Sequence, residues 1–277
     1  MVWKPMDIDE LAELAKQIRL DGLEMAKTSG RGGSHLGGSF SAVEILAVLY
    51  GHVLRLNVDE PEWAGRDRFL ASKNHCVLAH LPALARRGFF DVTELNEFQK
   101  NGGRLTGYPL RPEIGIEYSG GSLGMAISVG VGQSLALREK RLDARVFVLM
   151  GDAELNEGSI WEAFMSASHY KLDNLIAIID RNHLSYDGDT EEVMAVEPLE
   201  DKLKAFGWHV VKCDGHDVGD LVRAFDEVTE NSGRPHVVIA DTIKGKGVSF
   251  MEGVPSYHHA SINDKQYEQA KTELMKA

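Results

Sequence analysis

Apolar residues near the N-terminus recur at the spacing of an amphipathic helix. The positions on its apolar face are Ile8, Leu11, Leu14, Ala15 and Ile18. A glycine-rich loop follows over residues 29–39. The stretch from Ser41 to Glu44 then matches a capping box, in which the serine side chain caps the third amide and the glutamate reaches back. We therefore expect a second helix to begin there.

The region up to residue 144 continues as helices and glycine-rich loops. A helix is expected from Cys76, with Gly88 as its C-terminal cap. Residues 101–122 contain too many glycines for a regular element, and long ordered loops are often functional. Ser122 is expected to open a helix that runs to about Lys140. Its glycines are Gly124, Gly130 and Gly132, each costing roughly 1 kcal/mol of helix stability, so another element is expected to approach closely.

From residue 145 onward, short apolar runs alternate with helical patterns. The expected strands are Arg145–Met150, Leu175–Asp180, Trp208–Cys213 and His236–Asp241. The expected helices are Ile160–Tyr170, Pro198–Phe206, one capped by Asp217 that ends near Glu230, and a loosely docked C-terminal helix capped by Asn263 or Asp264. Strands of this kind form buried parallel sheets whose right-handed crossovers place helices on both faces. We predict an α/β fold, a doubly wound parallel sheet in a single domain of residues 1–277.

Composition and charge narrow the class of protein. The 277 residues are 43% hydrophobic and 26% charged, with a net charge of −12. Such an acidic chain is a poor general binder of nucleic acid or anionic membrane, so neither is expected as a partner. The two cysteines imply no disulfide framework, and the N-terminus lacks a signal pattern. No apolar run approaches the roughly 20 residues of a membrane span. A cytoplasmic protein is expected.

Two polar residues follow neighbouring predicted strands. Asp152 comes just after the first strand, and Asn182 lies 182 − 152 = 30 residues later, just after the second. If the strands are parallel neighbours, both side chains lie at the carboxyl ends of the sheet, where open α/β sheets bind ligands. Their oxygens suit Mg²⁺, and a helix beginning near Ser159 would point its amides at a bound diphosphate. A plain turn with a helix-capping aspartate is the alternative that these residues leave open.

The segment around these residues resembles the thiamine-diphosphate motif of the transketolase family. That motif is Gly-Asp-Gly followed some thirty residues later by Asn, and this chain reads GDAELNEGSIWEAFMSASHYKLDNLIAIIDRN. Further matches in the same order are SHLGGSFSAVEILAVLY, DRFLASKNH, GGSLGMAISVGVG, AFGWHVVKCDGHD and KGKGVSFMEGVPSYHH. The resemblance implies the diphosphate-binding domain of the thiamine-diphosphate-binding fold. It also implies reversible two-carbon ketol transfer from a ketose or ketose-phosphate donor to an aldose acceptor.

The resemblance also implies a metal and cofactor site. The metal, Mg²⁺ or else Ca²⁺ or Mn²⁺, would be bound by Asp152, Asn182 and the carbonyl of Leu184. The residues expected to bind thiamine diphosphate are His75, Gly121, Ser122, Leu123, Gly151, Asp152, Ala153, Glu154, Asn182, Lys244 and His258. Ala153 replaces the third glycine of the motif. Its methyl group is tolerable if the backbone angle φ is negative there.

Four positions match the family's channel for the cofactor and donor sugar. His35 and His258 are the candidates for proton handling, while His75 and Tyr108 would contact donor hydroxyls. Tyr108 stands where the family has histidine, and its reference pKa of about 10 prevents it from acting as a base near neutrality. This difference from the family affects the prediction of the sugar substrate more than the prediction of the cofactor. His259 could exchange roles with His258 if the alignment shifts by one residue.

The resemblance further implies a partner. In the family, a glutamate in the following pyrimidine-binding domain activates the cofactor, so we expect it on a separate C-terminal subunit in an α2β2 heterotetramer. Glu157 and Glu162 match family acids near the subunit interface. The alternatives are a transketolase for a sulfonated or branched ketose, a chain of a 2-oxo-acid dehydrogenase, a deoxyxylulose-phosphate synthase fragment, and a non-enzymatic regulatory module.

Overall fold

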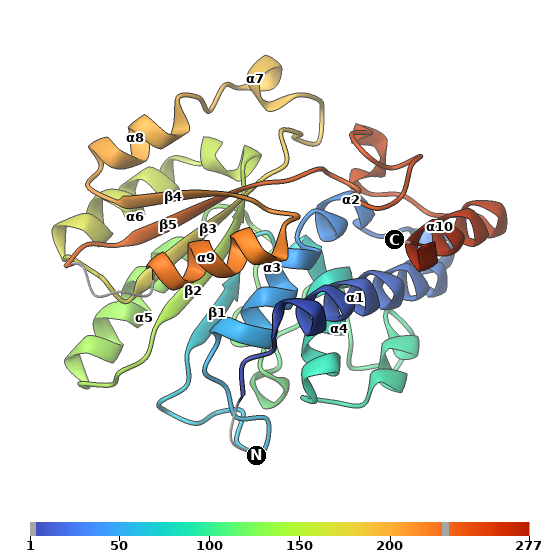
Figure 1. The fold of residues 1–277 in the computed structure, drawn as a ribbon, viewed down its shortest axis with the longest axis horizontal. Helices are drawn as coiled ribbons and strands as arrows, with labels where there is room; N and C mark the ends of the chain where they lie inside the picture. Colours follow the sequence, from blue (N-terminus) through green and yellow to red (C-terminus); the bar gives the residue numbers. More distant parts are fainter. Residues whose placement is uncertain (1–3, 229–232, 277) are drawn as a thin grey trace.

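The computed structural model describes residues 4–228 and 233–276. Within them, five parallel strands form a sheet in the order β1-β2-β3-β5-β4 (Figure 1). The strands are β1 Arg68–Ala71, β2 Val146–Gly151, β3 Leu175–Arg181, β4 His209–Asp214 and β5 His236–Asp241. The predicted parallel sheet is confirmed. β1 was not predicted, because its four residues were too short to give an apolar run of their own.

Helices cover both faces of this sheet (Figure 1). One face is covered by α1 Ile8–Thr28, α2 Leu36–Phe40, α3 Val43–Val48, α4 Val77–Arg87 and α9 Val218–Val228. The other face carries α5 Ala126–Glu139, α6 Gly158–His169 and α8 Leu199–Ala205. The short α7 Thr190–Val193 precedes α8, and α10 Asp264–Lys276 lies along α1. The doubly wound arrangement with helices on both faces is therefore confirmed.

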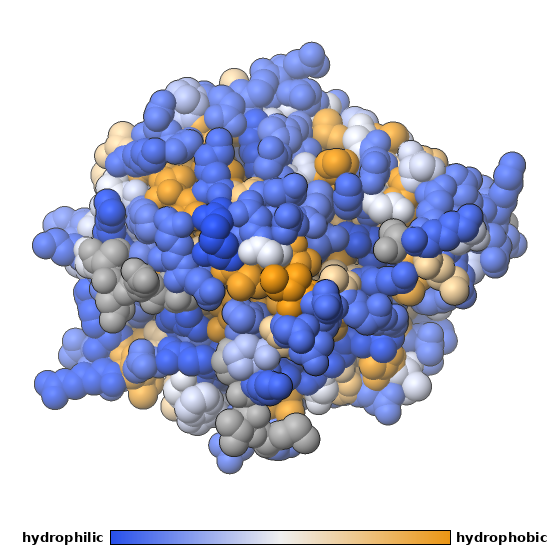
Figure 2. Space-filling model, viewed as in Figure 1, coloured by the Kyte–Doolittle hydropathy of each residue, from blue (hydrophilic) through white to orange (hydrophobic). Residues whose placement is uncertain are grey.

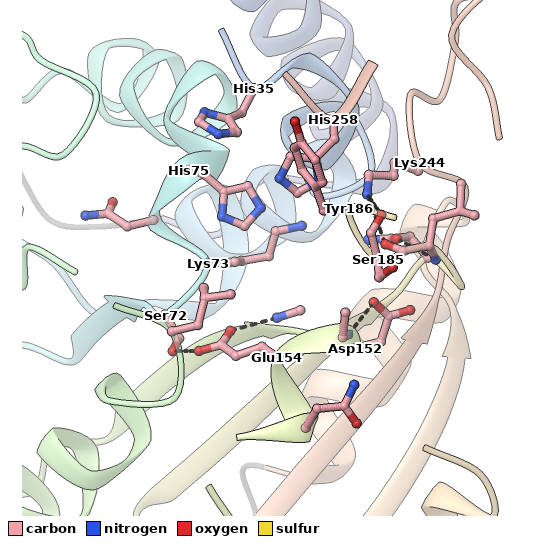
Figure 3. Close-up of a pocket in the computed structure, with 18 of the residues that line it drawn as sticks. His35, Ser72, Lys73, His75, Asp152, Glu154, Ser185, Tyr186, Lys244 and His258 are labelled. Carbon is pink, nitrogen blue, oxygen red and sulfur yellow. Dashed lines mark hydrogen bonds between the residues drawn. The ribbon is translucent and has the colours of Figure 1, made fainter. Parts of the chain in front are cut away.

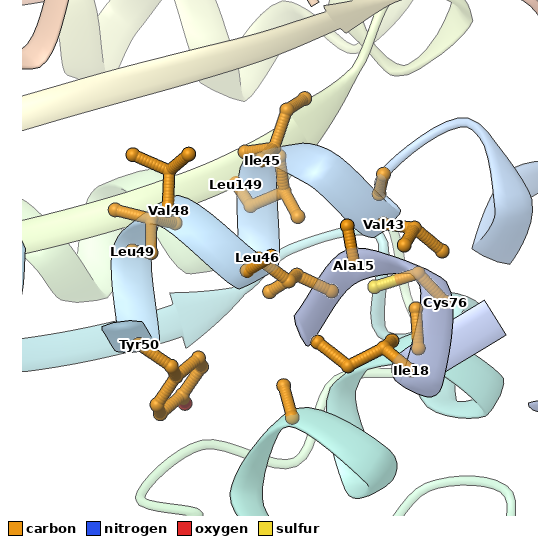
Figure 4. Packing of buried hydrophobic residues seen from close by; sticks show 14 of the residues in the cluster. Ala15, Ile18, Val43, Ile45, Leu46, Val48, Leu49, Tyr50, Cys76 and Leu149 are labelled. Carbon is orange, nitrogen blue, oxygen red and sulfur yellow. The ribbon is translucent and has the colours of Figure 1, made fainter. Parts of the chain in front are cut away.

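Alternation along the strands divides the core into two clusters. In β2, Phe147 and Leu149 join the cluster beneath α1, α3 and α4, while Val146 and Val148 join the cluster beneath α5 and α6. Figure 4 shows the first cluster, in which Leu149 meets apolar side chains of α3. β2, β3 and β5 are buried on both faces and read as continuous apolar runs in the sequence, whereas the edge strand β4 alternates buried and exposed residues in its second half.

The capping box predicted at Ser41 and Glu44 is wrong. α3 begins at Val43, and its start has no side-chain cap. The Ser41 hydroxyl instead donates to Asp180 Oδ2 at 2.6 Å, and Glu44 accepts from Arg19 at 2.6 Å. Both side chains of the expected capping box thus form hydrogen bonds with residues far away in the sequence instead of with the start of the helix.

The helix expected from Ser122 begins later, at Ala126. Gly124 adopts a left-handed φ of 80°, which prevents the helix from starting before it. Inside the helix, a Cβ on Gly130 would lie 2.8 Å from a methyl group of Val148, so the predicted close approach is confirmed there. Gly132 has open space around it and shows no such approach.

The remaining helix ends agree with the sequence at most points. Gly88 is the left-handed cap of α4, and Asp217 accepts from the Asp220 amide at the start of α9. The expected end of that helix near Glu230 lies outside the described residues. Asn263 caps α10, which has a thin apolar stripe, as predicted. Ala270 and Leu274 on this stripe are nevertheless buried in the core cluster that includes α1, so the helix is packed rather than loosely docked.

The surface carries mostly hydrophilic side chains on the face seen in Figure 2, in keeping with the high content of charged residues. In the part of the chain that the structure describes, none of the helices combines the length and apolar character that a membrane span requires.

Candidate active site

A cavity of about 360 Å³ lies at the carboxyl ends of β2 and β3 (Figure 3). Its walls come from loops that lie far apart in the sequence: those before α2 and α4, the glycine-rich loop before α5, and those after β2, β3 and β5. The predicted site residues that line it are His35, His75, Tyr108, Gly121, Leu123, Gly151, Asp152, Ala153, Glu154, Asn182, Leu184, Lys244 and His258. The fold thus brings almost the whole predicted site together.

The predicted metal ligands stand where the parallel register places them. β2 and β3 pair so that Gly151 lies opposite Asp180, and Asp152 and Asn182 come directly after these strand ends. Both side chains are buried and line the cavity together with Leu184. Among the described residues there is no group of three or more His, Cys, Asp and Glu side chains suited to a metal. The predicted ligands are one carboxylate, one side-chain amide and one backbone carbonyl, so they would not form a group of that kind.

The Asp152 carboxylate is held in one orientation by its neighbours. Its Oδ1 accepts from the Ala153 amide at 2.8 Å, and its Oδ2 accepts from the His183 amide at 2.6 Å and from Arg181 at 3.0 Å. Burial and the nearby Asp180 carboxylate raise the pKa of Asp152, although Arg181 opposes this. An oxygen ligand for a cation is therefore already fixed at the floor of the cavity.

Lys244 reaches the third predicted ligand. Its ammonium donates to the carbonyl oxygens of Leu184 at 2.9 Å and Ser185 at 2.8 Å. Burial lowers the pKa of Lys244 to about 8, and the neighbouring Lys73 acts in the same direction. The loop after β3 thus turns carbonyl oxygens toward a cation.

Three histidines from separate segments gather on one side of the cavity. The ring centroids of His35 and His75 are 5.3 Å apart, those of His75 and His258 are 5.2 Å apart, and those of His35 and His258 are 5.4 Å apart. Burial, followed by the charge of Lys244, lowers the pKa of His258 to about 3. Burial, followed by His259, lowers the pKa of His35 to about 4, and burial also keeps the pKa of His75 well below its usual range. All three imidazoles are neutral at neutral pH.

A buried ion pair lies beneath these histidines. Lys73 pairs with Asp180, and the hydroxyls of Ser41 and Thr242 also donate to this carboxylate. Burial raises the pKa of Asp180, but the Lys73 ammonium and the hydroxyls of Ser41 and Thr242 together outweigh it, and the pKa ends below its usual range. The pair links the loop before α4 to the end of β3, so it fixes the distance between the histidine wall and the floor.

Glu154 holds the glycine-rich loop in place rather than facing the cavity freely. Its carboxylate accepts from the Ser72 hydroxyl, from the Gly124 amide at 2.7 Å and from the Gly151 amide at 3.1 Å. The backbone angle φ of Ala153 is not positive, so its methyl group introduces no backbone strain. In the loop after β2 the last residue that lines the cavity is Asn156, so the first turn of α6 does not line it, and the orientation of its amides toward a diphosphate stays a prediction.

Several features fit the cofactor that the sequence implies. Asn74 Nδ2 and His258 Nδ1 are buried at the cavity without a protein partner among the described residues. A Cβ on Gly121 or Gly151 would meet no atom within 4 Å, so the backbone there borders open space. Together with the oxygen donors and Lys244, these groups match a metal-bound diphosphate with an attached polar ring.

Three predicted residues lie outside the cavity. Ser122, Glu157 and Glu162 are exposed and none of them lines it. Tyr108 does line it and is partly open to solvent. The structure therefore gives Ser122 and the two glutamates no place in the wall of this cavity.

Comparisons with known proteins agree with this geometry. Residues 10–276 match the family model described as transketolase, thiamine diphosphate binding domain. The chain is 44% identical over 243 residues to one subunit of the apulose-4-phosphate transketolase of Phocaeicola vulgatus, covering 87% of this chain and 85% of that protein. It is 38% identical over 272 residues to 6-deoxy-6-sulfo-D-fructose transketolase subunit SqwG of a Clostridium species, covering 98% and 97%.

The chain belongs to the transketolase family. Its chemistry is thiamine-diphosphate-dependent ketol transfer, and its sheet and helices form the thiamine-diphosphate-binding fold. Transketolase from Leishmania mexicana superimposes with a TM-score of 0.90 at 27% identity, covering 98% of this chain. That superposition covers only 42% of the Leishmania chain, and human transketolase, 33% identical, is likewise covered over 42% of its length.

Sequence reasoning missed several residues of this transketolase site. Lys73 and Arg181 lie next to predicted residues in the segments DRFLASKNH and IIDRN, yet no pattern showed that they would be buried. Tyr186, whose ring centroid lies 5.0 Å from that of His258, was also missed. Adjacency to a motif was the signal available for the first two, whereas Tyr186 depends on how its loop folds back.

Proposed function

We propose that this chain is the cofactor- and metal-binding subunit of a two-subunit transketolase and is active only with a partner that supplies the pyrimidine-binding domain. The observation that carries the proposal is the cavity that joins three neutral histidines to the Asp152, Asn182 and Leu184 oxygens. When bound, thiamine diphosphate supplies the electron sink for breaking and forming the carbon–carbon bond.

Different groups in the cavity are proposed to bind the metal and the diphosphate. Asp152, Asn182 and the Leu184 carbonyl hold Mg²⁺, which favours oxygen ligands and commonly takes others from phosphate. The Lys244 ammonium, which donates to the carbonyls of Leu184 and Ser185, would supply a cation to the diphosphate. Gly151 and Ala153 line the cavity where the same anion would lie, and their amides are held by the carboxylates of Glu154 and Asp152. Other cofactor contacts come from Gly121, Ser122, Leu123, Glu154, His75 and His258.

The neutral histidines handle protons. A neutral imidazole accepts a hydrogen bond from a sugar hydroxyl and can take its proton when the carbon–carbon bond breaks. Its efficiency as a base is greatest when its pKa lies near the working pH, so we propose that the bound cofactor and substrate bring the pKa of the histidine closer to 7. His258 Nδ1 is suited to this because it has no partner within the described protein, and His35 stands beside it. His75 and Tyr108 orient the hydroxyls of the donor. The buried Lys73 keeps additional positive charge off His75.

An exposed apolar face supports the proposed partner. Met125 just before α5, Val129 on α5 and Met165 on α6 are 48%, 38% and 60% exposed. We propose that the partner subunits cover this face in an α2β2 assembly and so bring Glu157 and Glu162 into an interface. Three of the relatives are themselves named as subunits of transketolases, which agrees with a divided enzyme.

The donor is proposed to be an anionic ketose. The two relatives compared above are named for apulose-4-phosphate and for 6-deoxy-6-sulfo-D-fructose, both of which carry a negative group. Tyr108 at the partly open mouth of the cavity is the residue in this chain that we expect to tune the choice between such sugars.

Calorimetric titration of thiamine diphosphate and Mg²⁺ into this chain, alone and with the C-terminal subunit, tests the proposal alongside a ketol-transfer assay. Tight binding and transfer only in the mixture are expected, with apulose-4-phosphate, 6-deoxy-6-sulfo-D-fructose and xylulose 5-phosphate compared as donors. Full activity of this chain alone would refute the need for a partner. No binding even in the mixture would refute the cofactor site.

The partner face has its own test. Met165→Glu places a charge on the exposed face and is expected to weaken assembly by roughly 10-fold or more, because a desolvated charge at an interface is unfavourable. Met275→Glu is the matched control, since Met275 is as exposed but lies on α10. Equal assembly of both variants would place the partner elsewhere.

A further inference from the structure

We propose that Arg181 is a positioning residue that ties the Asp152 carboxylate to the segment 184–197, which supplies part of the cavity wall. The inference rests on the proposed function, because it takes Asp152 as a metal ligand. It predicts that the metal ligand and the wall of the cavity are organised together, through one guanidinium.

The guanidinium of Arg181 makes four contacts with three nitrogens. One terminal nitrogen donates to Asp152 Oδ2 at 3.0 Å and to Thr190 Oγ1 at 2.7 Å. The other donates to Glu191 Oε1 at 3.0 Å, and Nε donates to Glu197 Oε1 at 3.2 Å. The side chain is only 4% exposed. A buried fork that joins a carboxylate at the end of β2 to three residues of one segment is a fixed connection rather than a solvated charge.

The fold leaves this guanidinium little freedom. Arg181 is the last residue of β3, and its carbonyl accepts from the Thr242 amide at 3.0 Å, so its backbone is anchored to the chain that follows β5. Because side chains alternate along a strand, Arg181 and Asp180 point to opposite faces. Asp180 therefore serves Lys73 beneath the histidines, while Arg181 serves Asp152 and the segment 184–197.

The segment folds back onto Arg181 through its own carboxylates. Glu191 accepts from the Val196 amide at 3.2 Å and from the Glu197 amide at 3.3 Å. Glu197 accepts from the Leu199 amide at 2.7 Å. Between Arg181 and these bonds lies the part of the segment that lines the cavity, including Tyr186, which packs against His258 (Figure 3). Loss of the guanidinium would leave two carboxylates of this segment without their shared cation.

Arg181 has two opposite effects on metal affinity: its positive charge repels the metal, and its hydrogen bond keeps the Asp152 carboxylate in the orientation that binds the metal. A cation beside a metal ligand repels the metal, so charge alone predicts tighter metal binding when Arg181 is removed. Orientation predicts weaker binding, because Asp152 Oδ2 would keep only the His183 amide as a donor. Partners that hydrogen-bond a metal ligand usually contribute about 10- to 100-fold to metal affinity, so we take orientation to dominate.

Three variants separate the parts of the connection. Arg181→Met removes every donor at nearly constant volume, Arg181→Lys keeps the charge but loses the fork, and Thr190→Val removes only one link to the segment. Arg145→Met is the control, because Arg145 pairs with Asp67 at the opposite end of the sheet. Mn²⁺ binding to the full chain, mixed with the C-terminal subunit and thiamine diphosphate, is measured by electron paramagnetic resonance. Amide hydrogen exchange of residues 184–199 is measured without any ligand.

Arg181→Met is expected to weaken Mn²⁺ binding by about 10- to 100-fold. The Val196, Glu197 and Leu199 amides should exchange roughly tenfold faster or more, since they rely on carboxylates that Arg181 holds. Arg181→Lys should approach Arg181→Met in both measurements, whereas Thr190→Val should accelerate exchange with a smaller effect on Mn²⁺. Arg145→Met should change neither measurement, even if it lowers the melting temperature.

Several results would overturn the inference. Tighter Mn²⁺ binding by Arg181→Met would show that charge dominates, and an unchanged Arg181→Lys would show that the fork is unnecessary. A lower melting temperature with normal Mn²⁺ binding and exchange would reduce Arg181 to a purely structural role. If the unsubstituted chain bound no Mn²⁺ even with the C-terminal subunit present, the proposed function would fail together with the metal half of the inference. Amide exchange would still decide whether Arg181 holds the wall.

Discussion

The buried ion pair of Lys73 and Asp180 makes a quantitative prediction. Both side chains are almost fully shielded, at 1% and 0% exposure, so Lys73→Met leaves the Asp180 carboxylate without a cation in a dry environment. The hydroxyls of Ser41 and Thr242 would still donate to it, but they carry no charge. Removing one partner of a buried pair costs about 3–5 kcal/mol. For a chain of this size the melting temperature should fall by roughly 6–20 °C.

Urea unfolding followed by circular dichroism measures this loss. The double variant Lys73→Met/Asp180→Asn buries no charge, so it should recover more than half of the stability that the single variant loses. Lys271→Met is the control: its exposed ammonium pairs with Glu24, and such pairs contribute about 0–1 kcal/mol. The reasoning is refuted if Lys73→Met unfolds within about 1 kcal/mol of the original chain, or if the double variant loses the sum of both single losses.

Three further predictions concern the histidines and helix α5. His258→Ala should lower ketol-transfer turnover roughly 100-fold or more without changing the unfolding midpoint, and normal turnover would contradict its proposed role. The pKa of His35 is about 4 in the folded state and near 6.5 in the unfolded state, so the unfolded state binds more protons between these pH values. The free energy of unfolding should therefore fall as the pH drops from 6.5 to 4, and it should fall less steeply in His35→Asn. Gly132→Ala should stabilise the chain by about 1 kcal/mol, whereas Gly130→Ala should destabilise it because its Cβ would meet Val148; equal midpoints in urea would contradict the close packing.

Much of the fold could be predicted because its strands are apolar and its helices periodic. Four strands lay within two residues of their predicted limits at each end. Burial on both faces gives β2, β3 and β5 continuous apolar runs, and the edge strand β4 keeps apolar residues on its buried face. β1 escaped because Arg68–Ala71 has only three buried residues and takes its identity from pairing with β2. The supposed capping box at Ser41 failed because a distant carboxylate, Asp180, competes for the serine hydroxyl. A local sequence pattern does not show which residue from a distant part of the chain will hydrogen-bond a given side chain.

The candidate site divides in the same way. Asp152 and Asn182 were predictable because strand ends and a spacing of one crossover fix their positions. The histidines were found through the family resemblance, since nothing local distinguishes His35 from a surface histidine. Lys73 and Arg181 could not be predicted, because a charged residue is expected at the surface unless its partner is known. Their roles follow from strand register, which only the structure supplies.

The strand order has a consequence for the way this chain is made. β4 leaves β3 without pairing to it and is hydrogen-bonded to β5, which comes 236 − 214 = 22 residues later. While the chain is being synthesised, β4 and the apolar face of α9 must therefore wait beside an incomplete sheet until residues 236–241 insert between β3 and β4. Chains whose apolar surface stays uncovered in this interval are prone to associate wrongly. The last strand of this sheet to emerge from the ribosome is thus the one that closes the fold, and slow translation just before residue 236 would lengthen the vulnerable period.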